Sequence, residues 1–298
     1  MKKVCYFLGL LFASSHAHAE ADGPDFYRIT GTTPAPMYAA KAETSQLILL
    51  LPPDTDGLKN LGCTGIPTFS AWQNMTEAER QAAKQNSWCK IDVNSRQGWI
   101  KQQFLAEGSA VTAKPSFDCT APRPHEIEIL ICGNPELIAL DNKMQQRYQA
   151  ALNAANALDA DTAQAIDTLK KSQSGWLKGR NECWKALDAR TSCTINEYRQ
   201  RMAYLQVKWQ LVKPTTTARY SCNAAKTDEL TAYFFPDAEV PGVAIDYGDS
   251  RAVLTQQPAE SGTRYVGNFG KVFWVTGQQA KFTWTPAEAV KTCTLASD

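Results

Sequence analysis

The chain has 298 residues, of which 44% are hydrophobic, 20% are charged and 10% are aromatic, and its formal net charge is +1. A charge so close to zero argues against general nucleic-acid binding, which needs a strong excess of basic residues for phosphate contacts. The hydrophobic content is too high for a disordered chain, and the length allows roughly two to three domains.

The first 19 residues have the pattern of a secretory signal peptide. Lys2 and Lys3 give it a positive start, an apolar run covers residues 4–13, and Ala-His-Ala at 17–19 is a typical cleavage site. The alternative is an uncleaved membrane anchor, but the run is only half of the ~20 residues that span a bilayer. We therefore predict an exported protein, periplasmic or secreted, with no membrane anchor.

Eight of the nine cysteines lie beyond this segment, and an even number of cysteines in an exported chain is typical of disulfides. Their spacing favours pairs of consecutive cysteines, each contributing about 2–4 kcal/mol of stability. The alternative is a zinc site, but no Cys-x-x-Cys occurs and His125 is the only histidine outside the signal peptide, so we predict no metal. The eight are Cys63, Cys89, Cys119, Cys132, Cys183, Cys193, Cys222 and Cys293.

Short apolar runs, separated by Gly, Pro and polar turns, extend from residue 26 to residue 105. A helix-like stretch at 75–85 is inserted between two of them. The runs that we expect to form strands are 45–51, 58–63, 88–93 and 98–104.

Four features stand out in this part of the chain: Trp88-Cys89-Lys90-Ile91, Gly98-Trp99-Ile100, Leu105, and Cys63 in the preceding strand. Together they resemble a bacterial SH3-like domain. The resemblance implies a β-barrel at 20–105 in which Cys63 and Cys89 pair across neighbouring strands. The resemblance also implies a module that binds cell-wall peptides or proteins. No ligand-binding residue of the family can be carried over to this sequence.

A polar linker of small residues at 106–115 precedes a helical segment at 116–211. Asn134-Pro135-Glu136 is a typical helix start, with a capping side chain, a proline in the first turn and an acid at the positive end. A second helix is expected after Asp161 and a third near Thr194. Their apolar residues recur at steps of three and four, which is typical of helices packed in a core rather than of a cofactor site.

Residues spread over most of this segment carry a family resemblance. They are Phe117-Asp118-Cys119, Glu128, Ile131-Cys132, Leu140-Asp141, Met144, Tyr148, Trp176-Leu177, Arg180, Cys183, Cys193, Tyr198, Arg201 and Leu205. In this order they resemble the family named after the lysozyme inhibitor LprI. The resemblance implies a small helical bundle with the disulfides Cys119–Cys132 and Cys183–Cys193, and it carries over no inhibitory residue.

After a second linker at 213–217 the hydrophobic period changes to two. Eight short runs with turn residues between them predict an antiparallel barrel or sandwich at 218–298. The runs are 219–224, 229–235, 243–247, 251–256, 263–267, 271–275, 279–284 and 290–295. Cys222 on the first strand and Cys293 on the last are expected to close it.

Three motifs and a terminal cysteine characterise this last segment: Tyr220-Ser221-Cys222, Ser-Gly-Thr-Arg-Tyr at 261–265, Phe-Trp-Val-Thr-Gly-Gln-Gln-Ala at 273–280, and Cys293. They resemble the MliC/PliC family, periplasmic or membrane-bound inhibitors of c-type lysozyme. The resemblance implies an eight-stranded β-barrel, in agreement with the strand count. The expected fold is thus multi-domain, α and β: an SH3-like β-barrel, a disulfide-stapled helical bundle and an eight-stranded antiparallel β-barrel.

The residues give little support to catalysis. His125 is the only histidine available to a nucleophile, no thiolate remains if all eight cysteines are oxidised, and we expect His125 to be a surface or capping residue. The motifs H-E-x-x-H, G-x-S-x-G, G-x-G-x-x-G and the P-loop are absent from the sequence. The alternative of a glycosidase-like pair of carboxylates stays open, but no pair is marked. We predict no catalytic residue and no cofactor.

Inhibition of a lysozyme requires hydrogen-bond donors that reach the two carboxylates of its cleft. The resemblance implies a serine in an S-G-x-x-Y motif and a lysine in a W-x-K-G motif. Here Ser261, Gly262 and Tyr265 match the first motif, with Tyr265 expected to anchor the strand below the loop. The alternative is an ordinary turn at 261–262. Thr276 and Gly277 stand where the second motif has lysine and glycine.

The missing lysine is the main departure from the family pattern. Losing a charge-assisted hydrogen bond costs about 1.5–3 kcal/mol of binding free energy, which raises the Kd about ten- to a hundredfold. We expect Lys271 or Arg264 to supply the missing positive charge from a neighbouring position.

Two functions therefore compete. The first is an exported inhibitor that blocks the active-site cleft of c-type lysozyme and protects peptidoglycan, with the SH3-like domain bound to the wall. The alternative is a non-inhibitory scaffold protein that binds the cell envelope or peptidoglycan.

Overall fold

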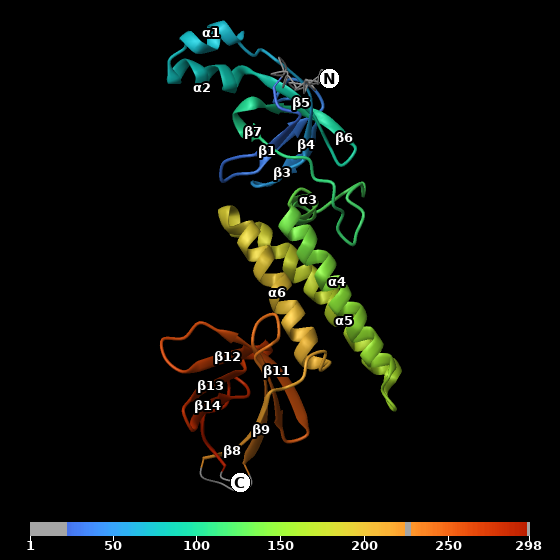
Figure 1. Ribbon diagram of the computed structural model, residues 1–298, viewed down its shortest axis with the longest axis vertical. Helices are drawn as coiled ribbons and strands as arrows, with labels where there is room; N and C mark the ends of the chain where they lie inside the picture. The colour runs from blue at the N-terminus through green and yellow to red at the C-terminus, as the bar shows by residue number, and fades with distance from the viewer. Residues whose placement is uncertain (1–22, 224–227, 297–298) are drawn as a thin grey trace, which may run out of the picture.

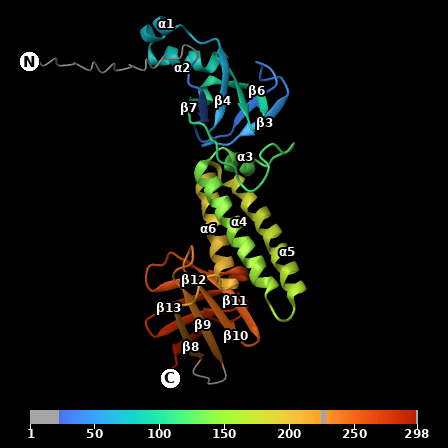
Figure 2. The same ribbon diagram turned by 45° about the vertical axis from the view of Figure 1, so that its right-hand side comes forward.

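The computed structural model describes residues 23–223 and 228–296, which form a mixed α/β protein. Figures 1 and 2 show three parts stacked along the long axis: a β-sheet at one end, a group of helices in the middle and a β-barrel at the other end. The expected signal peptide at 1–19 lies outside the described residues.

The N-terminal part is a seven-stranded antiparallel sheet in the order β3-β2-β6-β5-β4-β1-β7. Its strands are β1 (Phe26–Ile29), β2 (Ala35–Tyr38), β3 (Leu47–Leu51), β4 (Leu58–Thr64), β5 (Trp88–Val93), β6 (Arg96–Lys101) and β7 (Leu105–Glu107). All four predicted strands are present, whereas β1, β2 and β7 were not predicted. Alternate residues of β5, such as Ile91 and Val93, are buried in its core.

Two short helices, α1 (Phe69–Asn74) and α2 (Glu77–Asn86), are inserted between β4 and β5 where one helix was predicted. In α2 a capping box forms, because the Thr76 side chain accepts from the Glu79 N–H while Glu79 accepts from the Thr76 N–H. Neither helix has a buried residue, and Figure 1 shows both standing away from the sheet.

The middle part contains α3 (Glu126–Cys132), α4 (Pro135–Asn156), α5 (Thr162–Asn181), a 3₁₀ segment (Glu182–Ala189) and α6 (Arg190–Lys208). The predicted start of α4 is confirmed, since the Asn134 side chain accepts from the Leu137 N–H at 3.1 Å. Helix α6 begins four residues before the predicted Thr194. Helix α3 follows His125 directly, where a helix was expected, although its bounds were not predicted; its cap is His125, whose Nδ1 accepts from the Ile127 N–H at 3.2 Å. The capping role expected for His125 is confirmed.

The C-terminal part is a closed barrel in which all neighbouring strands are antiparallel. The strands are β8 (Thr216–Cys222), β9 (Glu229–Phe235), β10 (Gly242–Tyr247), β11 (Ser250–Gln257), β12 (Thr263–Gly267), β13 (Val272–Thr276), β14 (Gln279–Thr283) and β15 (Lys291–Leu295). The eight predicted strands are confirmed, with shifts of a few residues at their ends.

The structure contains the four disulfides that the sequence predicts: Cys63–Cys89, Cys119–Cys132, Cys183–Cys193 and Cys222–Cys293. Cys63 lies opposite Cys89 in the β4–β5 register. Cys222 lies opposite Cys293 in the β8–β15 register, so this disulfide joins the first and last strands of the barrel.

Both linkers are shorter than predicted, because regular structure extends into them. Strand β7 ends at Glu107, two residues into the first linker, and β8 begins at Thr216, inside the second.

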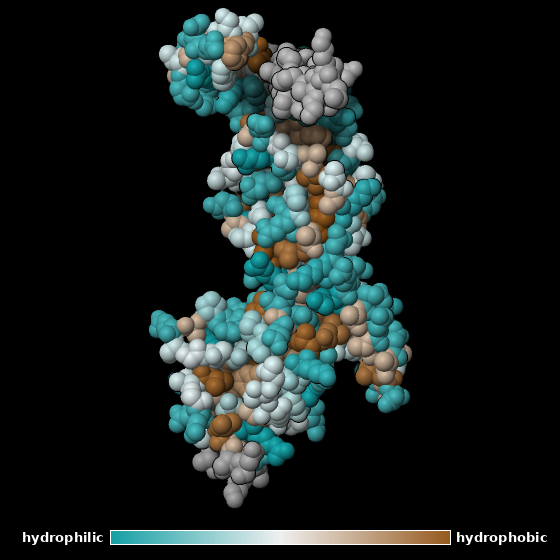
Figure 3. Space-filling view, in the orientation of Figure 1, coloured by the Kyte–Doolittle hydropathy of each residue, from teal (hydrophilic) through white to brown (hydrophobic). Residues whose placement is uncertain are grey.

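Helix α6 packs against β10 and β11, and a Cβ on Gly242 would meet Val207 Cγ2 at 2.8 Å. On the face shown in Figure 3, hydrophobic side chains gather where the helices meet the barrel.

At the other junction, α3 lies against β3, and Ile129 of this helix belongs to the core of the sheet. The Asp56 N–H donates to the Gly133 carbonyl at 2.7 Å. The three parts are therefore joined by packed contacts as well as by the chain.

Candidate functional site

The predicted contact residues Ser261 and Thr276 lie together on the outer surface of the barrel. They line an open hollow of about 230 Å³ formed by β13, β14, β15 and the loop before β12. Its lining residues are Ser261, Trp274, Thr276, Gln279, Ala280, Lys281 and Thr292.

Because successive side chains of β13 point to opposite faces, Trp274 and Thr276 lie outside the barrel. Phe273 is buried in the core, whereas Trp274 is half-buried and Thr276 is exposed. Thr276 pairs with Gln279 across a two-residue turn, which begins with Gly277 at φ +59°. Glycine is favoured at this position because a hairpin of this length needs a positive φ there.

Close backbone approach brings the serine motif onto the end of β13. Gly262 has φ +67°, and a Cβ there would overlap the Val275 carbonyl and lie 2.8 Å from Thr276 Oγ1. The Trp274 indole Nε1 donates to the Ser261 carbonyl at 2.8 Å. These two constraints hold Ser261 beside Thr276, although the residues are 15 positions apart in the sequence.

We expect Gly262→Ala to displace the loop that carries Ser261. The left-handed backbone costs alanine about 1–2 kcal/mol, and the overlap with Val275 adds a further ~1–3 kcal/mol. Gly277→Ala is the matched control, because Gly277 also has positive φ but has nothing within 4 Å of the added Cβ. Urea unfolding should show the larger loss for Gly262→Ala, and equal losses would contradict the close approach.

Tyr265, which was expected to anchor the strand below the loop, is part of the barrel core. It is 7% exposed, its ring lies 6.0 Å from that of Phe234, and burial raises the pKa of its hydroxyl. A side chain in this place anchors β12 beneath the loop and does not reach a partner protein.

The structure does not place the two expected cations in the hollow. The Lys271 Nζ lies 4.6 Å from the centroid of the Trp284 ring, at the start of β13 rather than at its end. Arg264 lies opposite Trp274 on β12, outside the set of lining residues. The basic residue of the hollow is Lys281, which was not predicted from the sequence. Strand period and a two-residue turn after Thr276 are the sequence signals that could have placed it there.

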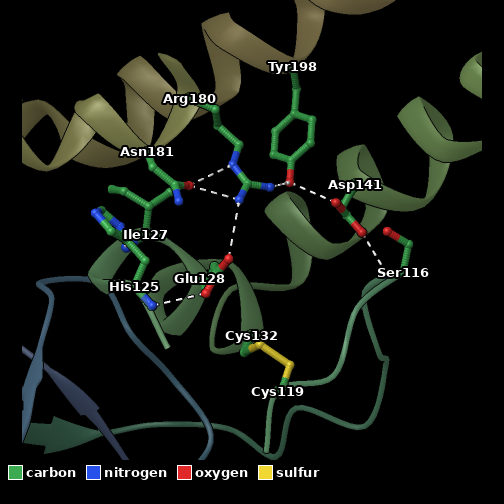
Figure 4. Close-up of polar contacts among 10 residues, drawn as sticks. All are labelled: Ser116, Cys119, His125, Ile127, Glu128, Cys132, Asp141, Arg180, Asn181 and Tyr198. Carbon is green, nitrogen blue, oxygen red and sulfur yellow. Dashed lines mark hydrogen bonds and ion pairs between the residues drawn. A yellow bond between two sulfur atoms is a disulfide. The ribbon is translucent and has the colours of Figure 1, made fainter. Parts of the chain in front are cut away.

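Four of the residues that characterise the helical part, Glu128, Asp141, Arg180 and Tyr198, belong to one polar network (Figure 4). Asp141 of α4 accepts from the Tyr198 hydroxyl at 2.8 Å and from the Ser116 N–H at 2.6 Å. The Tyr198 hydroxyl in turn accepts from Arg180 Nη1 at 3.0 Å. Burial raises the pKa of Tyr198 far above its usual range, so the phenol stays neutral.

Arg180 extends this network to α3. Its guanidinium donates twice to Asn181 Oδ1, at 3.1 and 2.8 Å, and lies 3.9 Å from Glu128 Oε1. The other oxygen of Glu128 accepts from the His125 N–H at 2.9 Å. The network joins α3, α4, α5 and α6, and its central Arg180 side chain is only 2% exposed, so its role is to hold the four helices together.

The described part of the chain holds no group of three His, Cys, Asp or Glu side chains arranged to bind a metal ion. Within the same residues, no helix combines the length and the apolar character needed to cross a membrane.

Two of the three parts are similar in sequence to known protein families. Residues 220–291 match the family described as membrane-bound lysozyme-inhibitor of c-type lysozyme, MliC. Residues 119–231 match the family described as lysozyme inhibitor LprI. Two segments of this chain are similar to lysozyme-inhibitor families. The two matched ranges overlap in β8 and β9, so the LprI similarity crosses the junction between helices and barrel.

Similar whole proteins include the proteins named lipoprotein LprI of Mycobacterium bovis and of two strains of Mycobacterium tuberculosis. Each is 27% identical over 169 residues, which cover 57% of this chain and 79% of the relative. No solved structure matches the chain significantly.

Proposed function

We propose that the chain is an exported inhibitor of c-type lysozyme whose barrel blocks the active-site cleft and so protects peptidoglycan. The observation that carries this proposal is the meeting of Ser261 and Thr276 in one exposed hollow, on a barrel similar to MliC proteins. The proposal involves no catalytic step and no cofactor.

Hydroxyl groups at the hollow have the chemistry that the cleft requires. Within residues 23–223 and 228–296, neither Ser261 Oγ nor Thr276 Oγ1 has a hydrogen-bond partner, so both are free to donate. One lysozyme carboxylate is ionised and acts as a strong acceptor, and a donor held in place by the fold loses little entropy on binding.

The other two parts have separate places in the proposal. The helical part at 116–211 presents the barrel through the packing of α6 on β10 and β11. The segment 20–105 is proposed as an SH3-like module that binds peptidoglycan and holds the inhibitor at the wall, in the periplasm or outside the cell.

Ser261→Ala is expected to weaken inhibition, because it removes one donor to a charged acceptor. The Kd for a c-type lysozyme should rise about tenfold or more, measured from a concentration series in a cell-wall lysis assay. Ser250→Ala is the matched control, since Ser250 is an exposed serine at the opposite end of β11 from the loop. Equal inhibition by both variants would contradict the placement of the contact.

A further inference from the structure

We infer that Lys281 supplies the positive charge that this barrel lacks at Thr276, and that it binds a carboxylate of the inhibited lysozyme. The inference rests on the proposed function and adds to it a residue that determines affinity and specificity. The positive charge of the inhibitor would then lie on β14, next to β13, which carries Thr276 at the motif position of the lysine.

The strand register fixes the place of this lysine. Lys281 on β14 lies directly opposite Trp274 on β13. Its neighbours Ala280 and Phe282 are 2% and 0% exposed, so the side chain of Lys281 lies outside the barrel. The Nζ atom is 6.0 Å from the centroid of the Trp274 ring, and Lys281 lines the same hollow as Ser261 and Thr276.

The charge of Lys281 is available to a partner. In the described residues its ammonium has neither a hydrogen bond nor an ion pair, and its one recorded interaction is with the Trp274 ring. By contrast, the Lys291 Nζ of the same barrel is 2.8 Å from Asp228 Oδ2. An unpaired ammonium avoids the cost of breaking an internal ion pair when it binds an external carboxylate.

The composition of the hollow also favours an acidic partner group. Its seven lining residues include no carboxylate, and they include one ammonium, two threonine hydroxyls besides Ser261, and an amide. Glu260 precedes Ser261 in the loop but does not line the hollow. A lysine is a compact charge on a flexible stem with three donors, so it can follow a carboxylate that lies slightly off the position of the motif lysine.

The test compares Lys281→Gln with Lys271→Gln in the full exported chain, using the Kd for a c-type lysozyme. Both variants remove one lysine charge from the β13–β14 hairpin region, but only Lys281 lines the hollow. Lys281→Gln should raise the Kd about tenfold or more, whereas Lys271→Gln should leave it unchanged. Circular dichroism and the Tm of both variants serve as folding controls.

A second variant tests whether Lys281 replaces the motif lysine. Adding Thr276→Lys to Lys281→Gln returns a charge to the same hollow, so most of the lost affinity should be recovered. If the wild-type chain binds lysozyme and Lys281→Gln binds equally well, the role of Lys281 is refuted and the proposed function stands. If the wild-type chain does not bind lysozyme, both fail.

Discussion

Replacing Arg180 with methionine should destabilise the protein by about 3–5 kcal/mol, the usual cost of removing one member of a buried charged network. The variant keeps much of the side-chain volume but leaves the Tyr198 hydroxyl and Asn181 Oδ1 without the donors that they have in the structure. Urea unfolding monitored by circular dichroism measures the change in the free energy of unfolding.

Lys178→Met is the control for this prediction, because Lys178 is an exposed residue of the same helix. Its cost should be within ~0.5 kcal/mol, as for most surface substitutions. A loss of the same small size for Arg180→Met would show that the network does not hold the helices together. Asp141, which is 1% exposed, would then need another explanation for its burial.

Removing the Cys222–Cys293 disulfide, by changing both cysteines to serine, should be the most costly disulfide deletion in the chain. The two residues are 71 positions apart, so the bond restricts a long loop of the unfolded chain and contributes about 4 kcal/mol in the chain-entropy treatment. The bond also joins the first and last strands of the barrel. The measurement is again the free energy of unfolding in urea.

The matched variant changes Cys183 and Cys193, which are 10 positions apart, to serine. The same treatment gives about 3 kcal/mol for that loop, so its loss should be the smaller of the two. A larger loss for the short loop would mean that native packing around Cys183, which is 3% exposed, outweighs the entropy of the unfolded chain.

Local sequence rules predicted much of this fold. The start of α4 needs only a capping Asn134 followed by Pro135, and the strands of the barrel show an alternation that neighbouring residues reveal. These rules gave the start of helix α3 after His125 but not its extent, because α3 lies between the sheet and the other helices. Five of its seven residues are buried, so it has no polar face and no helical period.

The missed strands have a similar explanation. Strand β2 has four residues and contains Pro36, which disfavours a strand prediction. It forms between β3, the next strand in the chain, and β6, which comes from a distant part of the chain. Such pairing is a property of the whole fold and has no local signal.

The candidate site divides in the same way. The motifs around Ser261 and Thr276 could be found in the sequence, and the resemblance to MliC proteins connected them. The position of Lys281 depends on the register of β13 and β14, which one sequence does not fix. The register also explains why Lys271, only five residues before Thr276, is not part of the hollow.

The central claim, inhibition of c-type lysozyme, is tested most directly by cell-wall lysis with the full chain added in a concentration series. We predict that the lysis rate falls to zero as the chain saturates the enzyme, and that the chain alone causes no lysis. Pelleting with sacculi in the absence of lysozyme measures wall binding in parallel. An unchanged lysis rate at every concentration, with or without binding to sacculi, would contradict the inhibitor and leave the envelope scaffold as the better description.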